Sequence, residues 1–366
     1  MNHLPASPPL RPIPSVFSLE SPLESPLVSP LALPLADVVP RLASTCARLT
    51  ALILTALLAT ALFPAAHAQP YPNKPIRMIV PFPPGGAADL AARTVVQALS
   101  NGLGQQIIID NRGGADGAIA GNAVVSSAPD GYTILFATTT GLNAAPVMRK
   151  QPPYDPISAF TPITMVGKFG FFLFVHESLP AKTVPEFLAY VRANPGKVNY
   201  GTGNGTSILT TAQLALVEKL DMLHVPYKGD AATTQDLIAG RVQVMIGTPG
   251  SAMPQVASGR LRVLAALLPN RSPLAPDAPT ATEAGLRGLT ISPWAGLFGP
   301  TGLPREVVER LGREMKVVAA KPEIKAALDR IAFEVQASSP EEMAAFLKDQ
   351  LEVWKKTANE LGLERN

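Results

Sequence analysis

The chain has 366 residues, enough for two domains of ordinary size, and 47% of them are apolar and 16% charged. A formal net charge of +3, without a cluster of basic residues among aromatic ones, gives no basis for nucleic-acid binding and favours anionic ligands only mildly. Cys46 is the single cysteine, which excludes a disulfide framework and a cysteine-based metal site.

The first 68 residues have the parts of an export signal. Residues 1–40 are rich in proline, serine and leucine, a composition that forms neither regular helix nor sheet. Two arginines then precede an uncharged apolar run at 49–63, and Ala66-His67-Ala68 ends the segment. This order is typical of a secretory signal peptide, whereas a retained membrane anchor usually needs ~20 apolar residues. We therefore predict cleavage after Ala68 and a mature, soluble, exported chain that begins at Gln69.

Short β-branched runs alternate with helical stretches from Gln69 onward, a pattern typical of α/β folds with mainly parallel sheets. The first set has expected strands at 76–80, 107–109 and 132–137, and expected helices at 88–99 and 118–127. This β-α-β-α-β order is similar to half of a Rossmann fold.

A second α/β set and a helical tail follow. Strands are expected at 163–166, 171–175, 198–200, 224–227, 242–246, 261–267 and 289–297, and helices at 184–193, 207–220, 305–319, 322–331 and 340–361. Ser339 and Glu342 have the spacing of a capping box at the start of the last helix. The pattern predicts two lobes, with the tail packing back on the first.

The loop between the first strand and the first helix is the first candidate anion site. Gly85, Gly86 and Ala87 offer backbone N–H groups at a helix N-terminus, and glycine lets an anion approach the backbone. The alternative is that the glycines only allow the chain to turn. Asp89, with Arg93 four residues later, is expected to shape this loop and would contact a ligand directly only if that ligand carried an amine.

Two further loops carry the same chemistry. Thr138, Thr139 and Asn143 follow the third strand, at the edge where open α/β sheets bind ligands, although an ordinary polar turn is the alternative. The stretch Gly203-Asn204-Gly205-Thr206-Ser207 precedes a helix and combines glycines with hydroxyls; its Thr206 or Ser207 could also cap that helix.

Three further side chains complete the set of candidate site residues. Thr248 follows the strand expected at 242–246, and Phe82 and Tyr227 could line a cleft as apolar walls, although aromatic side chains usually pack in cores.

Several short stretches, taken together in their order and spacing, resemble the substrate-binding proteins of tripartite tricarboxylate transporters, the Bug family. These stretches are 71–77, 80–89, 110–113, 128–133, 153–156, 203–207, 224–229, 279–280 and 283–286. The resemblance extends from Tyr71 to about Leu361. One departure stands out: many relatives carry an acidic residue or an asparagine at about Gly247 and Thr248, which suggests a pocket for a less polar acid.

The resemblance implies a two-lobed α/β protein of the type II-like periplasmic-binding-protein fold, with a ligand cleft between lobes joined by crossing strands. It places lobe 1 at 69–170 and 290–366 and lobe 2 at 171–289, and it favours the functional interpretation of the glycine and threonine loops. It implies a monomer that captures a small carboxylate (a di- or tricarboxylate, an aromatic acid or an acidic amino acid) for a membrane permease. A sensor that signals to a membrane receptor is the alternative.

The mature sequence gives no support for catalysis or a cofactor. It contains no cysteine, no G-x-S-x-G elbow, no P-loop and no complete dinucleotide-binding glycine motif. His176 and His224 are its two histidines, and neither has a partner at metal-ligand spacing. We expect no enzyme, no cofactor and no metal site.

Overall fold

The computed structural model describes residues 49–52, 54, 71–289, 291 and 293–362. The chain divides into two units, Met1–Ala68 and Gln69–Asn366. Cys46, the Pro-rich leader and the cleavage point predicted after Ala68 lie outside the described residues. Within the described part, no helix has both the length and the apolar character needed to cross a bilayer.

The first sheet has six strands in the order β11-β4-β10-β3-β1-β2. The strands are β1 (Ile76–Val80), β2 (Ile107–Asn111), β3 (Thr133–Thr138), β4 (Phe160–Phe169), β10 (Trp294–Pro300) and β11 (Phe333–Val335). Strand β1 pairs in parallel with β2 and β3, whereas β10 and β11 pair antiparallel with their neighbours. We call this sheet and the helices on it the first lobe.

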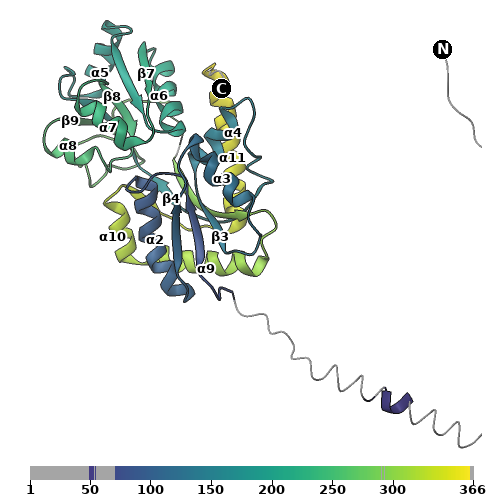
Figure 1. Cartoon of the computed structure of the whole chain (residues 1–366). Helices are drawn as coiled ribbons and strands as arrows, with labels where there is room; N and C mark the ends of the chain where they lie inside the picture. Colours follow the sequence, from purple (N-terminus) through teal and green to yellow (C-terminus); the bar gives the residue numbers. More distant parts are fainter. Residues whose placement is uncertain (1–48, 53, 55–70, 290, 292, 363–366) are drawn as a thin grey trace, which may run out of the picture. The chain divides into compact units, whose positions relative to one another are not determined.

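The second sheet has five strands in the order β7-β6-β8-β5-β9 and belongs to the second lobe (Figure 1). The strands are β5 (Phe171–His176), β6 (Val198–Thr202), β7 (Met222–Pro226), β8 (Val244–Gly247) and β9 (Leu261–Leu267). Strand β6 pairs in parallel with β7 and β8, and β5 pairs antiparallel with β8 and β9.

Both sheets are therefore mixed, and the prediction of mainly parallel sheets was wrong. Parallel pairing of successive strands requires a crossover helix. Only Gly170 separates β4 from β5, where the chain passes from the first sheet to the second. It returns through residues 268–293 to β10. The strand membership supports the lobe boundaries that we propose at residues 170 and 290.

The helices agree with the expected positions to within a few residues, apart from several short additions. The helices are α2 (Ala87–Leu103), η1 (Ala115–Gly117), α3 (Ala118–Val125), η2 (Thr140–Ala144), α4 (Ala145–Val147), α5 (Val184–Ala193), α6 (Gly205–Val217), α7 (Asp230–Ile238), α8 (Met253–Ala257), α9 (Arg305–Ala320), α10 (Pro322–Asp329) and α11 (Pro340–Glu360). The sequence missed α7, α8, β11 and the π-helical turn η2, and it placed β10 too early.

The C-terminal helices pack on the first lobe, as predicted. Helix α9 contacts α2 and β4, and α11 contacts β4 and η2. Val307, Leu311 and Met315, spaced four residues apart on α9, are buried. Helix α11 begins with the predicted capping box of Ser339 and Glu342. The tail therefore completes the first lobe after the chain has built the second.

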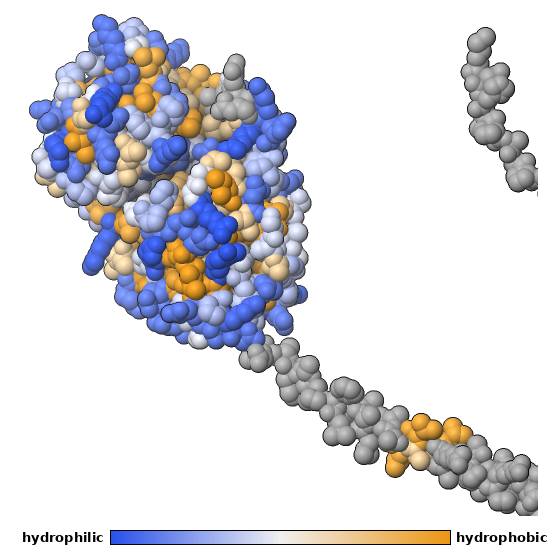
Figure 2. All heavy atoms as spheres, viewed as in Figure 1, coloured by the Kyte–Doolittle hydropathy of each residue, from blue (hydrophilic) through white to orange (hydrophobic). Residues whose placement is uncertain are grey.

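Hydrophilic side chains cover most of the face visible in Figure 2, with smaller apolar patches between them. The largest fully buried side chains include Trp294, Trp354 and Phe298. The ring of Trp294 lies 6.1 Å from that of Phe298. This packing holds the start of β10, where the chain re-enters the first lobe beside the cleft.

Candidate ligand-binding site

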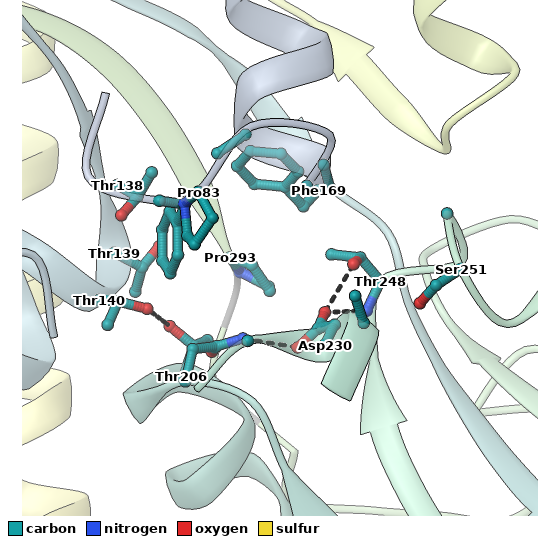
Figure 3. Close-up of a pocket in the computed structure, with 18 of the residues that line it drawn as sticks. Pro83, Thr138, Thr139, Thr140, Phe169, Thr206, Asp230, Thr248, Ser251 and Pro293 are labelled. Atoms are coloured by element: carbon teal, nitrogen blue, oxygen red, sulfur yellow. Dashed lines mark hydrogen bonds between the residues drawn. The ribbon is translucent and has the colours of Figure 1, made fainter. Parts of the chain in front are cut away.

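A cavity of about 250 Å³ lies between the loops that follow β1 and β3 in the first lobe and those that follow β6, β7 and β8 in the second (Figure 3). Its walls are largely apolar, with proline and aromatic side chains such as Phe82, Phe169 and Trp294. A cavity of this volume has room for a small organic molecule.

The N-terminus of α2 forms one polar end of the cavity. Gly85, Gly86, Ala87 and Ala88 line it. No side chain caps α2, and the first N–H groups of a helix have no acceptor within the helix. Gly85 has φ +82°, a left-handed conformation that favours glycine. These N–H groups and the helix dipole make a suitable receptor for a carboxylate.

Asp89 lies behind this loop and does not line the cavity. Its carboxylate accepts hydrogen bonds from the Gly85 N–H (2.9 Å), Arg93 Nε (2.8 Å) and Asn111 Nδ2 (2.9 Å). Burial alone would raise the pKa of Asp89, but these hydrogen bonds and the charge of Arg93 hold the pKa below its ordinary value. Asp89 thus shapes the loop, in keeping with the structural role expected from the sequence.

Three threonines at the end of β3 line the neighbouring wall. The Thr139 hydroxyl accepts a hydrogen bond from the Trp294 N–H at 2.6 Å and is thereby tied to β10. Within the described part of the chain, the buried Thr138 Oγ1 has no hydrogen-bond partner. The buried Thr138 hydroxyl therefore has hydrogen-bonding capacity left for a ligand. Asn143 lies in η2 outside the lining, where its Oδ1 accepts a hydrogen bond from Trp294 Nε1 (3.1 Å).

The start of α6 brings the second lobe against the first. Asn204 caps the helix by accepting a hydrogen bond from the Ser207 N–H at 3.0 Å, and Ser207 Oγ accepts one from the Asn204 N–H. The sequence had suggested Thr206 or Ser207 as the cap, but the helix begins two residues earlier than predicted. Thr206 instead bonds across the cleft to the Thr140 hydroxyl at 2.9 Å.

The carboxylate of Asp230, which no local sequence pattern indicated, lines the second-lobe end of the cavity. Asp230 Oδ2 accepts hydrogen bonds from Thr248 N (3.0 Å) and Thr248 Oγ1 (2.6 Å), and Oδ1 accepts one from Asn204 Nδ2 (3.0 Å). Burial raises the pKa of Asp230 above its ordinary value, although these hydrogen bonds oppose the rise. The available signal was an aspartate directly after Gly229, at a position where a helix could begin.

Most of the predicted site residues line this one cavity. Those that do are Phe82, Gly85, Gly86, Ala87, Thr138, Thr139, Asn204, Thr206 and Thr248. Asp89, Asn143, Gly203, Gly205, Ser207 and Tyr227 are not among the lining residues. The Tyr227 hydroxyl, for example, donates to Asp236 Oδ2 at 2.8 Å. Lining residues that the sequence did not suggest include Pro83, Thr140, Phe169, Asp230, Ser251, Pro293 and Trp294.

The family model described as the tripartite tricarboxylate transporter family receptor matches residues 91–363. The chain belongs to this family. A curated relative, the UPF0065 protein in the tcbD–tcbE intergenic region of Pseudomonas sp. (strain P51), is 36% identical, over 81% of this chain and 89% of its own length.

Two solved structures are similar over most of the chain. One, described as a periplasmic transporter, has a TM-score of 0.77 and 35% identity, covering 81% of this chain and 100% of that one. The other, Rpa4515 of R. palustris with adipate, has a TM-score of 0.76 and 31% identity, covering 80% and 98%. The resemblance and the two-lobed α/β fold predicted from the sequence are thus confirmed.

Proposed function

We propose that this protein captures a small carboxylate in the periplasm and delivers it to the membrane permease of a tripartite transporter. The observation that carries the proposal is the polar end at Gly86 and Ala87, where uncapped N–H groups of α2 face a cavity with largely apolar walls. Membership of the receptor family and the adipate in the Rpa4515 structure support the same class of ligand.

The arrangement favours binding over catalysis. The hydroxyls that line the described cavity come from threonine and serine, and neither histidine nor cysteine stands beside them to act as a base or nucleophile. A carboxylate would be neutralised by N–H groups and the dipole of α2, with the Thr138 hydroxyl nearby. Such an ion is held without a covalent step and can be released to a permease.

Closure of the two lobes completes the mechanism. A ligand that contacts the first lobe through α2 and the second through the loops at Thr206 and Thr248 makes both sets of contacts only in the closed state. The hydrogen bond between Thr140 and Thr206 crosses the cleft and stabilises that state.

Gly86→Asp tests the carboxylate site. Gly86 has φ −76°, and an added Cβ meets its nearest atom, the Pro83 carbonyl oxygen, at 3.6 Å, so a side chain fits and the fold survives. The new carboxylate would occupy the anion's position and repel it. We expect a thermal-shift screen of mono-, di- and tricarboxylates to show stabilisation of the wild type and none of the variant.

The control is Gln97→Glu, which adds the same charge on the exposed face of α2. It should keep the wild-type response. Retained binding in Gly86→Asp, with an unchanged melting temperature of the ligand-free protein, would contradict the assignment of the anion site.

A further inference from the structure

The cavity has two polar ends of opposite character. The α2 end presents backbone N–H donors at Gly86 and Ala87, whereas the second-lobe end presents the carboxylate of Asp230. The close-up of the cavity shows Asp230 and Thr248 across from Pro83 and Thr138, with the apolar Pro293 between them (Figure 3). The donors attract a negative group, and the carboxylate attracts a positive one.

Asp230 has acceptor capacity left over. A carboxylate offers about four acceptor positions, and the hydrogen bonds from Thr248 and Asn204 occupy three of them, two on Oδ2 and one on Oδ1. The remaining position belongs to Oδ1. All three donors are uncharged, so they orient the carboxylate without cancelling its charge.

The two aspartates near the cavity differ in charge compensation. Asp89 is paired with Arg93 at 2.8 Å and has its carboxylate turned to its own loop. No ion pair joins Asp230 to a cation anywhere in the described ranges. Lys228 lines the same cavity but is exposed to solvent. Asp230 is thus a partly buried carboxylate at a ligand cavity, and no cation in the described part of the chain forms an ion pair with it.

Glycines next to Asp230 leave the space that its carboxylate occupies. A Cβ at Gly247 would lie 3.2 Å from Asp230 Oδ2 and 2.5 Å from Met245 Cε, so a side chain at residue 247 would crowd the place that Asp230 takes. Gly203 makes a similar allowance, because a Cβ there would clash with the Oδ1 atom and the backbone nitrogen of Asp230. Two glycines and two hydrogen-bonding neighbours therefore fix one charged group at the cavity wall.

We propose that Asp230 determines the specificity of the cleft and that the ligand is a small carboxylate that also carries an ammonium group at the opposite end of the molecule. The ammonium would donate to Asp230 Oδ1 and supply the missing positive charge. A second carboxylate at this position would meet a like charge in surroundings of low polarity, where repulsion is strong. This inference rests on the proposed capture of a carboxylate and narrows its substrate class.

A matched set of six-carbon acids tests the inference: 6-aminohexanoate, hexanoate and adipate, which end in an ammonium, a methyl and a second carboxylate. The four-carbon set of 4-aminobutyrate, butyrate and succinate covers a shorter span. Affinities are measured by isothermal titration calorimetry on the exported protein after extensive dialysis. At the better-fitting length, we expect the amino acid to bind at least tenfold more tightly than the monoacid, and the diacid to bind most weakly.

Asp230→Asn keeps the size of the side chain and removes its charge. We expect the three affinities to converge to within about threefold. Asp221→Asn, at an exposed carboxylate of the same lobe, is the control and should keep the wild-type order. Lys228→Gln removes the other charge at the cavity and shows whether the preference comes from Asp230 or from Lys228. Asp230→Ser serves as a second variant if Asp230→Asn does not fold.

Two results would overturn the inference while leaving carboxylate capture intact: a diacid that binds the wild type as tightly as the amino acid, or an Asp230→Asn variant that keeps the wild-type order. A Lys228→Gln variant that alone abolishes the preference would also overturn it. If none of these acids binds the wild type at either length, the inference fails, whereas carboxylate capture is decided separately by the thermal-shift screen of mono-, di- and tricarboxylates.

Discussion

Gly205 of the second lobe packs closely against Ala144 of the first, and its replacement by alanine offers a direct test of closure. A Cβ at residue 205, the first residue of α6, would lie 2.6 Å from the Cβ of Ala144 in η2 of the first lobe. Carbon atoms at rest are about 3.5–4.0 Å apart, so the lobes would have to separate by roughly 1 Å at this contact. Ala144 is buried and cannot turn its methyl group aside.

The cost of this clash falls on the closed state. Overpacking of this kind costs about 1–3 kcal/mol, which corresponds to about a fivefold to 150-fold loss of affinity if all of it opposes closure. The second lobe on its own is not strained, because the clash is with the first. We therefore expect Gly205→Ala to weaken binding of every acid by a similar factor, with little change in the melting temperature of the ligand-free protein.

Fluorescence titration reports the affinity, because Trp294, one of two tryptophans in the chain, lines the cavity. Small-angle scattering with and without ligand reports the closure. Gly312→Ala on α9 is the matched control: its Cβ would lie at an ordinary van der Waals distance, 3.7 Å, from the Ile163 carbonyl oxygen, and residue 312 lies away from the cleft. An affinity of Gly205→Ala within twofold of the wild type would refute the reasoning.

Two further substitutions test the first-lobe end. Thr138→Val removes a buried hydroxyl that has no partner in the described part of the protein; we expect the ligand-free protein to gain up to about 1 kcal/mol in unfolding free energy while binding weakens, and unchanged affinity would show that the ligand does not use this hydroxyl. Asp89 has a depressed pKa in the folded state, so its contribution to stability is fully present above the pKa of an unfolded aspartate, about 3.9, and is lost as the pH falls through the lower folded value. Asp89→Asn should therefore lower the melting temperature at neutral pH and flatten its decline in acid, whereas a parallel decline in both proteins would contradict this role.

The sequence was most informative where function depends on local backbone. A glycine pair between a strand and a helix predicts exposed N–H groups at the helix start, and Gly85 and Gly86 do line the cavity. The helices predicted at 305–319 and 340–361 likewise match α9 and α11 to within one residue, and the capping box predicted for the second is present. These features depend on neighbours within a few positions along the chain, which a sequence displays directly.

The rest of the site depends on contacts between residues that are far apart along the chain, and a local sequence pattern does not reveal such contacts. Trp294 reaches the cavity wall through hydrogen bonds to Thr139, which lies 155 residues earlier. Asp230 becomes part of the site because β7 and β8 flank β6, which brings the loops that carry Asp230, Asn204 and Thr248 together. No local pattern encodes that order of strands, and a lone aspartate after a glycine is unremarkable until the sheet is known.

The two lobes thus contact different ends of the ligand. The variants at Gly205 and Asp230 should separate the contribution of lobe closure to affinity from that of the second-lobe contact. Gly205→Ala disfavours the closed state whatever the ligand, so it should lower all affinities by one factor and keep their order. Asp230→Asn changes what the second lobe offers to the far end of the ligand, so it should change the order. Because a ligand can shift closure only through contacts that differ between open and closed states, a ligand without a group for Asp230 should also close the lobes less completely. Scattering curves that show equal closure with hexanoate and 6-aminohexanoate at saturation would argue that α2 and the apolar walls alone drive the lobes together.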